Sequence, residues 1–133
     1  MEAKSESSVE RTVTAFIDDY QEWAENGYSA TLPAGLEARV TGEALSILRD
    51  DATMYSGHDI AQVGKAKVLS LKVDESSPTE ATAIVRLDQS GVKVRQDGEV
   101  RGNGQKVTEL RISLVRAETW KINKQEVIDD GLN

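Results

Sequence analysis

The sequence contains no cysteine and only two prolines, and aromatic residues make up 5% of it. The absence of cysteine excludes disulfides, zinc–thiolate centres, iron–sulfur ligation and thiol catalysis. No stretch approaches the roughly 20 apolar residues that a membrane-spanning helix needs. Phosphate loops of the G-x-x-x-x-G-K-[ST] form and G-x-S-x-G nucleophile elbows are also missing. These absences exclude several common enzyme classes before any element is assigned.

What the sequence does contain is the composition of one globular domain. Its 133 residues are 38% hydrophobic and 29% charged, which is enough to build a single core. The net charge of −7 is uneven, because residues 1–59 hold twelve acidic and four basic residues, whereas residues 60–124 hold eight acidic and twelve basic ones. Scattered basic residues on an acidic chain disfavour nucleic-acid binding. We expect no nucleic-acid partner, and two halves of opposite sign that attract each other within the fold.

Apolar residues at helical spacing predict a helix over residues 7–26. Ser7 and Glu10 have the S-x-x-E spacing of a capping box, and Asn26-Gly27 supplies a stop. The apolar positions recur in steps of three and four. They are Val9, Val13, Phe16, Tyr20 and Trp23.

A second helix is predicted after Thr41, beyond a loop with a short helical turn. Gly57 is placed to end this helix, and His58 lies in the turn that follows. Asp50 and Asp51 then fall on its solvated side. The apolar face consists of Ala44, Leu45, Leu48, Ala52 and Tyr55.

The back half of the chain changes to a period of two, which is typical of half-buried strands. The dipeptide Asp97-Gly98 predicts a hairpin turn. The pattern predicts an α+β fold in which N-terminal helices pack on the concave face of a strongly curved antiparallel sheet of four to six strands. The alternating apolar sets are Leu69, Leu71 and Val73; Ala81, Ala83, Val85 and Leu87; Leu110, Ile112 and Leu114; and Trp120 with Ile122.

Five segments, taken in order, resemble one known superfamily. They are "VERTVTAFIDDYQEWAENG", "LPAGLEARVTGEALSIL", "QVGKAKVLSLKV", "TEATAIVRLDQSGVKV" and "ETWKI". Their order resembles the NTF2-like (cystatin-like cone) superfamily, most of all secreted or lipid-anchored actinobacterial domains of unknown function. The layout is also similar to that of the Mce-associated proteins and of the N-terminal domain of some penicillin-binding proteins.

This resemblance implies one NTF2-like domain over residues 9–128. We expect a flexible linker or trimmed terminus at residues 1–8 and a short tail at residues 129–133. The resemblance also implies a place outside the cytoplasm or attached to the cell envelope. The sequence leaves open a cytoplasmic place and whether a signal sequence or lipid anchor was removed ahead of Met1.

Some members of the superfamily, such as ketosteroid isomerases and SnoaL-type cyclases, are enzymes with a carboxylate base inside the apolar cone. The phrase "RDDATMYSG" resembles their passage from helix to strand. However, Asp88 is out of phase with the inward residues of its strand, and Asp50 and Asp51 are off the apolar face of their helix. One histidine cannot supply the paired histidines of scytalone-dehydratase-like members, nor a common metal site. We therefore predict a non-catalytic domain with no catalytic residue, no metal and no cofactor.

Four large aromatic residues are expected to face the groove between the helices and the sheet. They are Tyr20, Trp23, Tyr55 and Trp120. They either fill the core with their polar edges reaching solvent, which is the favoured interpretation, or form the wall of a small-molecule pocket. A small-molecule-binding or SnoaL/ketosteroid-isomerase-like cone is therefore the alternative function.

Basic residues at outward positions of the predicted sheet form a candidate surface for a protein partner or for a second copy of the chain. They are Lys72, Arg86, Lys93, Arg95, Arg111 and Lys121. We expect the domain to be an extracytoplasmic binding or assembly module. A scaffold of a conjugation or secretion system is a third alternative.

Overall fold

The computed structural model describes residues 8–102, 104 and 106–129. Three helices come first: α1 (Ser8–Glu25), α2 (Ala34–Ala38) and α3 (Gly42–Tyr55). None of these described helices has the length and apolar character needed to cross a bilayer. The strands that follow are β1 (Ile60–Val63), β2 (Lys67–Ser77), β3 (Glu80–Asp88), β4 (Lys93–Gln96), β5 (Glu99–Gly102), β6 (Val107–Arg116) and β7 (Trp120–Asp129).

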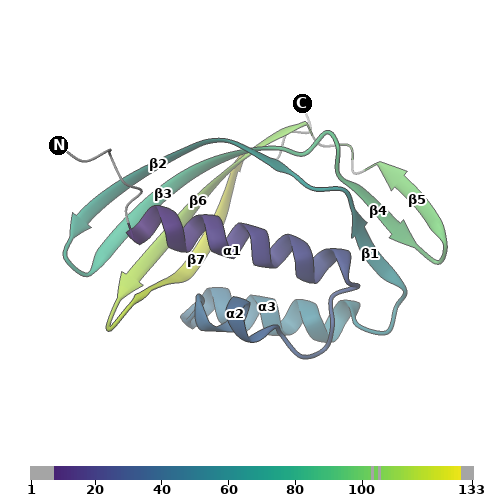
Figure 1. Ribbon diagram of the computed structural model, residues 1–133, viewed down its shortest axis with the longest axis horizontal. Helices are drawn as coiled ribbons and strands as arrows, with labels where there is room; N and C mark the ends of the chain where they lie inside the picture. Colours follow the sequence, from purple (N-terminus) through teal and green to yellow (C-terminus); the bar gives the residue numbers. More distant parts are fainter. Residues whose placement is uncertain (1–7, 103, 105, 130–133) are drawn as a thin grey trace.

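The strands form two antiparallel sheets. A main sheet has the order β2-β3-β6-β7, and a smaller second sheet has the order β1-β4-β5. In Figure 1 the main sheet arches over α1. Helices α2 and α3 lie on the same side of this sheet as α1, and the second sheet is at the right. The α+β class and a curved antiparallel sheet of four strands are confirmed, whereas the separate second sheet was not predicted.

The division into two sheets is set at Gly64, between β1 and β2. Gly64 has a φ of +80°, and a Cβ at this position would lie 2.4 Å from the carbonyl oxygen of Gly91. Only glycine combines this backbone conformation with so close an approach. Here β1 leaves the line of β2 and pairs instead with β4, where Ile60 lies opposite Gln96.

Helix α1 matches its prediction closely, because its bounds differ by one residue at each end. Its apolar face is buried, with Val9 and Val13 fully inaccessible. The N–H of Gly27 donates to the carbonyl of Ala24 (3.2 Å), and Gly27 adopts a φ of +92°. This left-handed residue ends the helix as the sequence indicated. Ser7, the predicted capping residue, lies outside the described residues.

The inward residues of β3, β6 and β7 follow the predicted alternation and form the core with α1 and α3. Leu110 is half-buried. The predicted inward residues that are buried are Ala81, Ala83, Val85, Leu87, Ile112, Leu114, Trp120 and Ile122.

Strand β2 departs from the prediction at one residue. The register with β3 slips between Val68 and Ser70, so that Leu69 is an extra, bulged residue. A bulge shifts the alternation by one position. Leu69 is therefore 51% exposed instead of pointing inward with Leu71 and Val73, which remain half-buried.

Candidate functional site

A cavity of about 230 Å³ lies between the helices and the concave face of the main sheet. Its apolar wall combines Phe16 of α1 and Leu48 of α3 with Leu87 of β3 and Leu110 of β6. These side chains come from four elements, so the cavity exists only in the folded domain. Its polar lining consists of Tyr20, Gln21, Asp51, Gln62, Gln89 and Gln125.

Asp51 lines this cavity, and the prediction that it lies on the solvated side of its helix is wrong. It follows Ile47 by four residues and Leu48 by three, so it shares their face of α3. All three side chains line the cavity. Asp50 is exposed, as predicted. The apolar face of α3 is therefore broader than its most buried residues indicate.

The carboxyl group of Asp51 has no neutralising neighbour. Partial burial, and then the negative charge of Asp50, raise the pKa of Asp51 above its ordinary value. Within the described part of the chain, Asp51 makes no hydrogen bond and no ion pair. Its charge is thus the one formal charge among the described residues that line the cavity.

The ring of Tyr20 forms part of the same cavity. Burial raises the pKa of its hydroxyl strongly, with smaller contributions from Tyr28, Asp51 and Tyr55. Like an ordinary phenol, the hydroxyl is protonated at neutral pH and can donate a hydrogen bond. Tyr20 also packs edge-on against Trp23, with ring centroids 5.6 Å apart.

The four aromatic residues predicted at the groove do not share one site. Trp23 is buried and donates its indole N–H to the carbonyl of Ser29 (3.1 Å), and Tyr55 packs against Tyr28. Trp120 lies at the far end of the main sheet, where the guanidinium of Arg116 is 6.0 Å from its ring. Of the four, Tyr20 alone lines the cavity. The core interpretation therefore describes Trp23 and Trp120, which are both buried in the hydrophobic core, whereas Tyr55 is half-buried.

Glutamines hold the polar side of the cavity in place, and the sequence analysis missed them. The Oε1 of Gln21 accepts from the N–H of Ala66 (2.6 Å) and from the Nε2 of Gln62 (3.2 Å). Its Nε2 donates to the carbonyl of Ala66 (3.3 Å). The available signal was the position of Gln21 on the apolar face of α1, four residues after Ile17, where a buried amide needs partners.

Exposed apolar side chains border the mouth of the cavity. Ile47 lines it and is 47% exposed. Val127 is 63% exposed and pairs across strands with Leu110, a lining residue. Val68 is 45% exposed and pairs in the same way with Leu87. Ile47, Val68 and Val127 are therefore exposed apolar residues that line the cavity or pair with residues that line it, and we call them the apolar rim.

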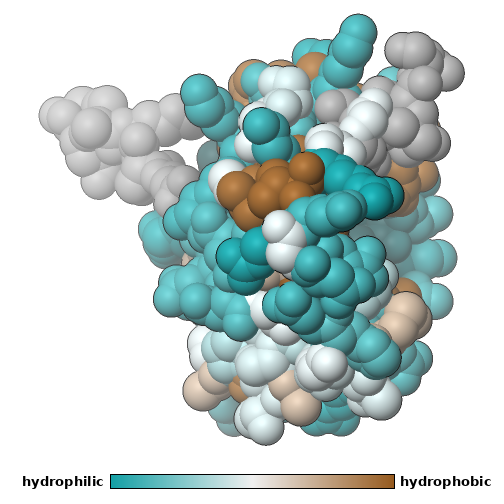
Figure 2. Space-filling model, turned by 90° about the vertical axis from the view of Figure 1, so that its right-hand side faces the viewer, coloured by the Kyte–Doolittle hydropathy of each residue, from teal (hydrophilic) through white to brown (hydrophobic). Residues whose placement is uncertain are grey.

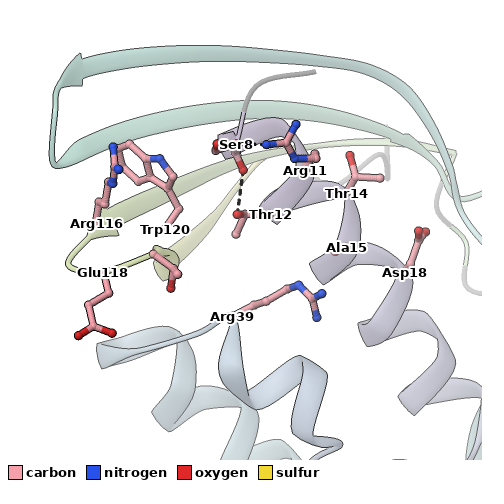
Figure 3. A pocket seen from close by; sticks show the side chains of 11 residues that line it. Ser8, Arg11, Thr12, Thr14, Ala15, Asp18, Arg39, Arg116, Glu118 and Trp120 are labelled. Carbon is pink, nitrogen blue, oxygen red and sulfur yellow. Dashed lines mark hydrogen bonds between the residues drawn. The ribbon is translucent and has the colours of Figure 1, made fainter. Parts of the chain in front are cut away.

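A larger but more open groove, of about 610 Å³, lies between α1 and the β6–β7 hairpin. Figure 3 shows Arg11, Arg39 and Arg116 around it, together with Asp18 and Glu118. Arg39 is already paired with Asp19 (2.5 Å). Charges of both signs line this groove, so it favours no single class of ligand.

The outer face of the main sheet carries four of the six predicted partner-binding residues: Lys72, Arg86, Arg111 and Lys121. Acidic residues alternate with them. Arg86 pairs across strands with Glu109, and the guanidinium of Arg111 lies 3.8 Å from the carboxylate of Glu126. The face is therefore mixed in charge and not basic.

The other two, Lys93 and Arg95, belong to β4 in the second sheet and do not share that face. Figure 2 views the molecule from the side on which β4 and β5 lie in Figure 1. It shows a largely hydrophilic surface with a compact hydrophobic patch above its centre and smaller hydrophobic areas at its edges. Val100 of β5 is an exposed apolar residue, at 51%. The six predicted residues thus lie on two surfaces.

His58 is exposed in the turn after α3, and its N–H donates to the carbonyl of Tyr55 (3.2 Å). Among the residues that the structure describes, no group of three or more histidine, aspartate or glutamate side chains could hold a metal ion. The stretch from Asp50 to Asp59 is the end of a helix and its turn, as the sequence predicts.

Comparison with known proteins identifies no family. No family model matches the sequence, and no curated protein matches it. The structure is similar to the intermembrane-space region of the chloroplast protein ARC6, with a TM-score of 0.56 and 16% identity over 95% of this chain and 99% of that one. An Ntf2-like protein involved in plasmid conjugation gives a TM-score of 0.44 and 13% identity over 96% of this chain and 42% of that one. At such identities the first likeness concerns the fold alone, and the second is too loose to support an argument.

Proposed function

We propose that this domain is a non-catalytic, extracytoplasmic binding module whose binding site is the cavity between the helices and the main sheet. The observation that carries the proposal is the combination of Tyr20 and Asp51 inside the cavity. Asp51 is partly desolvated and has no partner among the described residues, which costs free energy. A ligand that contacts both groups offsets this cost.

The apolar rim supports the same site. Ile47, Val68 and Val127 are exposed next to a cavity whose wall is itself apolar. A ligand that covers them gains roughly 25 cal/mol for each Å² of apolar surface removed from water. Large exposed apolar side chains beside a cavity are typical of a binding site.

The proposed location outside the cytoplasm rests on two features. The region of ARC6 that shares this fold lies in an intermembrane space, according to its description. The serine-rich segment "MEAKSES" ahead of α1 has the composition of a linker. Detection of the chain in the envelope or secreted fraction of the source cells tests this part of the proposal.

The binding site is tested with 1-hexanol as a neutral probe, followed by amide NMR. We expect the unmodified domain to bind it with shifts at the lining residues. Ile47→Trp should weaken binding about tenfold by filling the mouth. Met54→Trp is the matched control, because Met54 lies on the same helix, is 57% exposed and does not line the cavity.

The outcomes of this titration are distinct. Equal binding by the two tryptophan variants would place the probe elsewhere, and the absence of any shift in the unmodified domain would remove the proposed function.

An acid/base enzyme is the second candidate, and Asp51 favours it because a carboxylate now lies inside the cone. Asp51 would take the α-proton of a ketone, the electron pair of that C–H bond would form the enolate, and the Tyr20 hydroxyl would donate a hydrogen bond to the enolate oxygen. Incorporation of deuterium into cyclohexanone in heavy water tests this. The binding proposal predicts that deuterium is incorporated no faster with the domain than in buffer alone. A faster incorporation that Asp51→Asn abolishes would establish the enzyme.

A protein partner or a second copy on the outer sheet face is a third proposal, carried by the basic residues found there. Its support is weaker, because Glu109 and Glu126 neutralise Arg86 and Arg111 locally. An acidic partner would contact acidic as well as basic side chains on the outer face of the main sheet.

A further inference from the structure

We infer that the cavity takes a primary ammonium group carried on an apolar chain, with Asp51 as its counter-ion. This inference rests on the proposed function and specifies its ligand. Among the residues 8–102, 104 and 106–129, no lysine, arginine or histidine lines the cavity, whereas one aspartate does. The site therefore carries a negative charge that no described side chain compensates.

The carboxylate of Asp51 is placed to gain from a cation. Two opposite charges attract each other more strongly in a partly buried site than in water, because the effective dielectric constant is lower. The pKa of Asp51 is raised by burial and by Asp50, as expected of a carboxylate without a positive neighbour. A bound ammonium would reverse that direction.

The aromatic wall adds a second attraction for a cation. Tyr20 and Phe16 both line the cavity, with ring centroids 6.1 Å apart. The face of an aromatic ring attracts an ammonium group through its quadrupole. Apolar contacts with Leu87 and Leu110 would hold the attached chain.

The carboxyl end of α3 is a third feature that favours a cation, because it adds a partial negative charge. Asp51 lies near the carboxyl end of α3, where the helix carries a partial negative charge. Neither α3 nor α1 has a basic residue in its last turn. An anionic ligand would face this end and Asp51 together, and a neutral ligand would leave the carboxylate unpaired.

Three probes of equal chain length test the inference: n-hexylammonium, 1-hexanol and n-hexanoate, each titrated at neutral pH and followed by amide NMR. We expect n-hexylammonium to bind about tenfold more tightly than 1-hexanol, and n-hexanoate to bind most weakly. Asp51→Asn should bring the two tighter probes within about twofold of each other. Asp50→Asn is the matched control and should keep the preference, because Asp50 is exposed and does not line the cavity.

The failures of the inference and of the proposed function are distinguishable. Equal affinity for n-hexylammonium and 1-hexanol in the unmodified domain overturns the inference and leaves the binding site standing. No binding of any probe overturns both. The ratio of the affinities for n-hexylammonium and 1-hexanol in the unmodified domain tests the inference even where a variant does not fold.

A further arm identifies the source of the ammonium group. Nα-acetyl-lysine methylamide presents the same group on a protein-like backbone. Binding of this probe with the same dependence on Asp51 supports a lysine side chain of a partner, whereas binding of n-hexylammonium alone supports a free amine.

Discussion

At the scale of single residues, Gln21 and Asp51 show two fates of a polar side chain at an apolar interface. Gln21 is 7% exposed and its amide has three hydrogen-bond contacts. Asp51 borders the same cavity without a hydrogen bond or an ion pair to any described residue. A satisfied buried group stabilises a unique packing, whereas an unsatisfied one costs stability. A residue such as Asp51 therefore marks a place where a bound ligand can supply the missing partner.

The raised pKa of Asp51 predicts how its replacement depends on pH. Because the folded state raises this pKa, the protonated carboxyl is the favoured form, and stability is lost as pH rises through the raised value. Asp51→Asn should therefore raise the melting temperature at pH 7. The gain should vanish as pH falls below the ordinary carboxyl pKa of about 3.9.

Thermal unfolding across pH 3 to 8 measures this effect, with Glu43→Gln, an exposed acidic residue of the same helix, as the control. A gain that is the same at every pH would contradict the assigned environment of Asp51.

Replacement of Gln21 should destabilise the domain. Gln21→Leu keeps most of the side-chain volume but leaves the N–H and carbonyl of Ala66 without these partners, at a cost of about 1–3 kcal/mol in the free energy of unfolding. Glu22→Gln is the control on the exposed face of α1 and should change it by less than about 0.5 kcal/mol. Urea denaturation measures both, and equal stabilities would show that the Gln21 network contributes nothing.

At the scale of elements, the periodicity of the sequence predicted the helices and strands whose burial depends on a single apolar face. Helix α1 and the inward residues of β3 follow directly from spacing, because an amphipathic segment has one way to bury its apolar side. The bulge at Leu69 and the sharp turn at Gly64 did not follow. Both depend on the neighbouring chain, since a bulge is defined by the partner strand and the turn by the carbonyl of Gly91.

The turn at Gly64 predicts a large effect of one methyl group. Gly64→Ala would place a Cβ 2.4 Å from the carbonyl oxygen of Gly91 in a left-handed backbone conformation, and should cost at least about 1–3 kcal/mol in the free energy of unfolding. Gly91→Ala is the matched control, because a Cβ there meets nothing within 4 Å. Chemical denaturation compares the two, and a Gly64→Ala protein as stable as Gly91→Ala would refute the close approach.

The mixed charge of the outer sheet face predicts that its basic residues do not drive assembly. The double variant Arg86→Gln, Arg111→Gln should keep the mass of the unmodified domain in solution. Its free energy of unfolding should change by no more than about 1 kcal/mol, as exposed ion pairs contribute little. Light scattering measures the mass, and a lower mass would restore this face as an assembly surface.

At the scale of the whole molecule, the uneven charge of the sequence becomes two layers. The acidic front half forms the helices and the basic back half forms most of the strands, and the ion pair between Glu25 and Lys65 (3.6 Å) joins α1 to the start of the main sheet. The cavity lies where these layers meet. Composition predicted the attraction between the halves. The sequence analysis named a pocket in this groove as one alternative and placed Tyr20 in its wall, but the rest of the lining could not be predicted, because it comes from both layers and from residues that have no common spacing.

The measurement that tests the central claim most directly is a set of intermolecular NOEs between n-hexylammonium and the domain. The account predicts contacts from the terminal methyl group to Leu87 and Leu110, and from the methylene beside the nitrogen to the ring of Tyr20. Contacts confined to Trp120 and the groove beside it, or to the outer sheet face, would contradict the assignment of the cavity as the binding site.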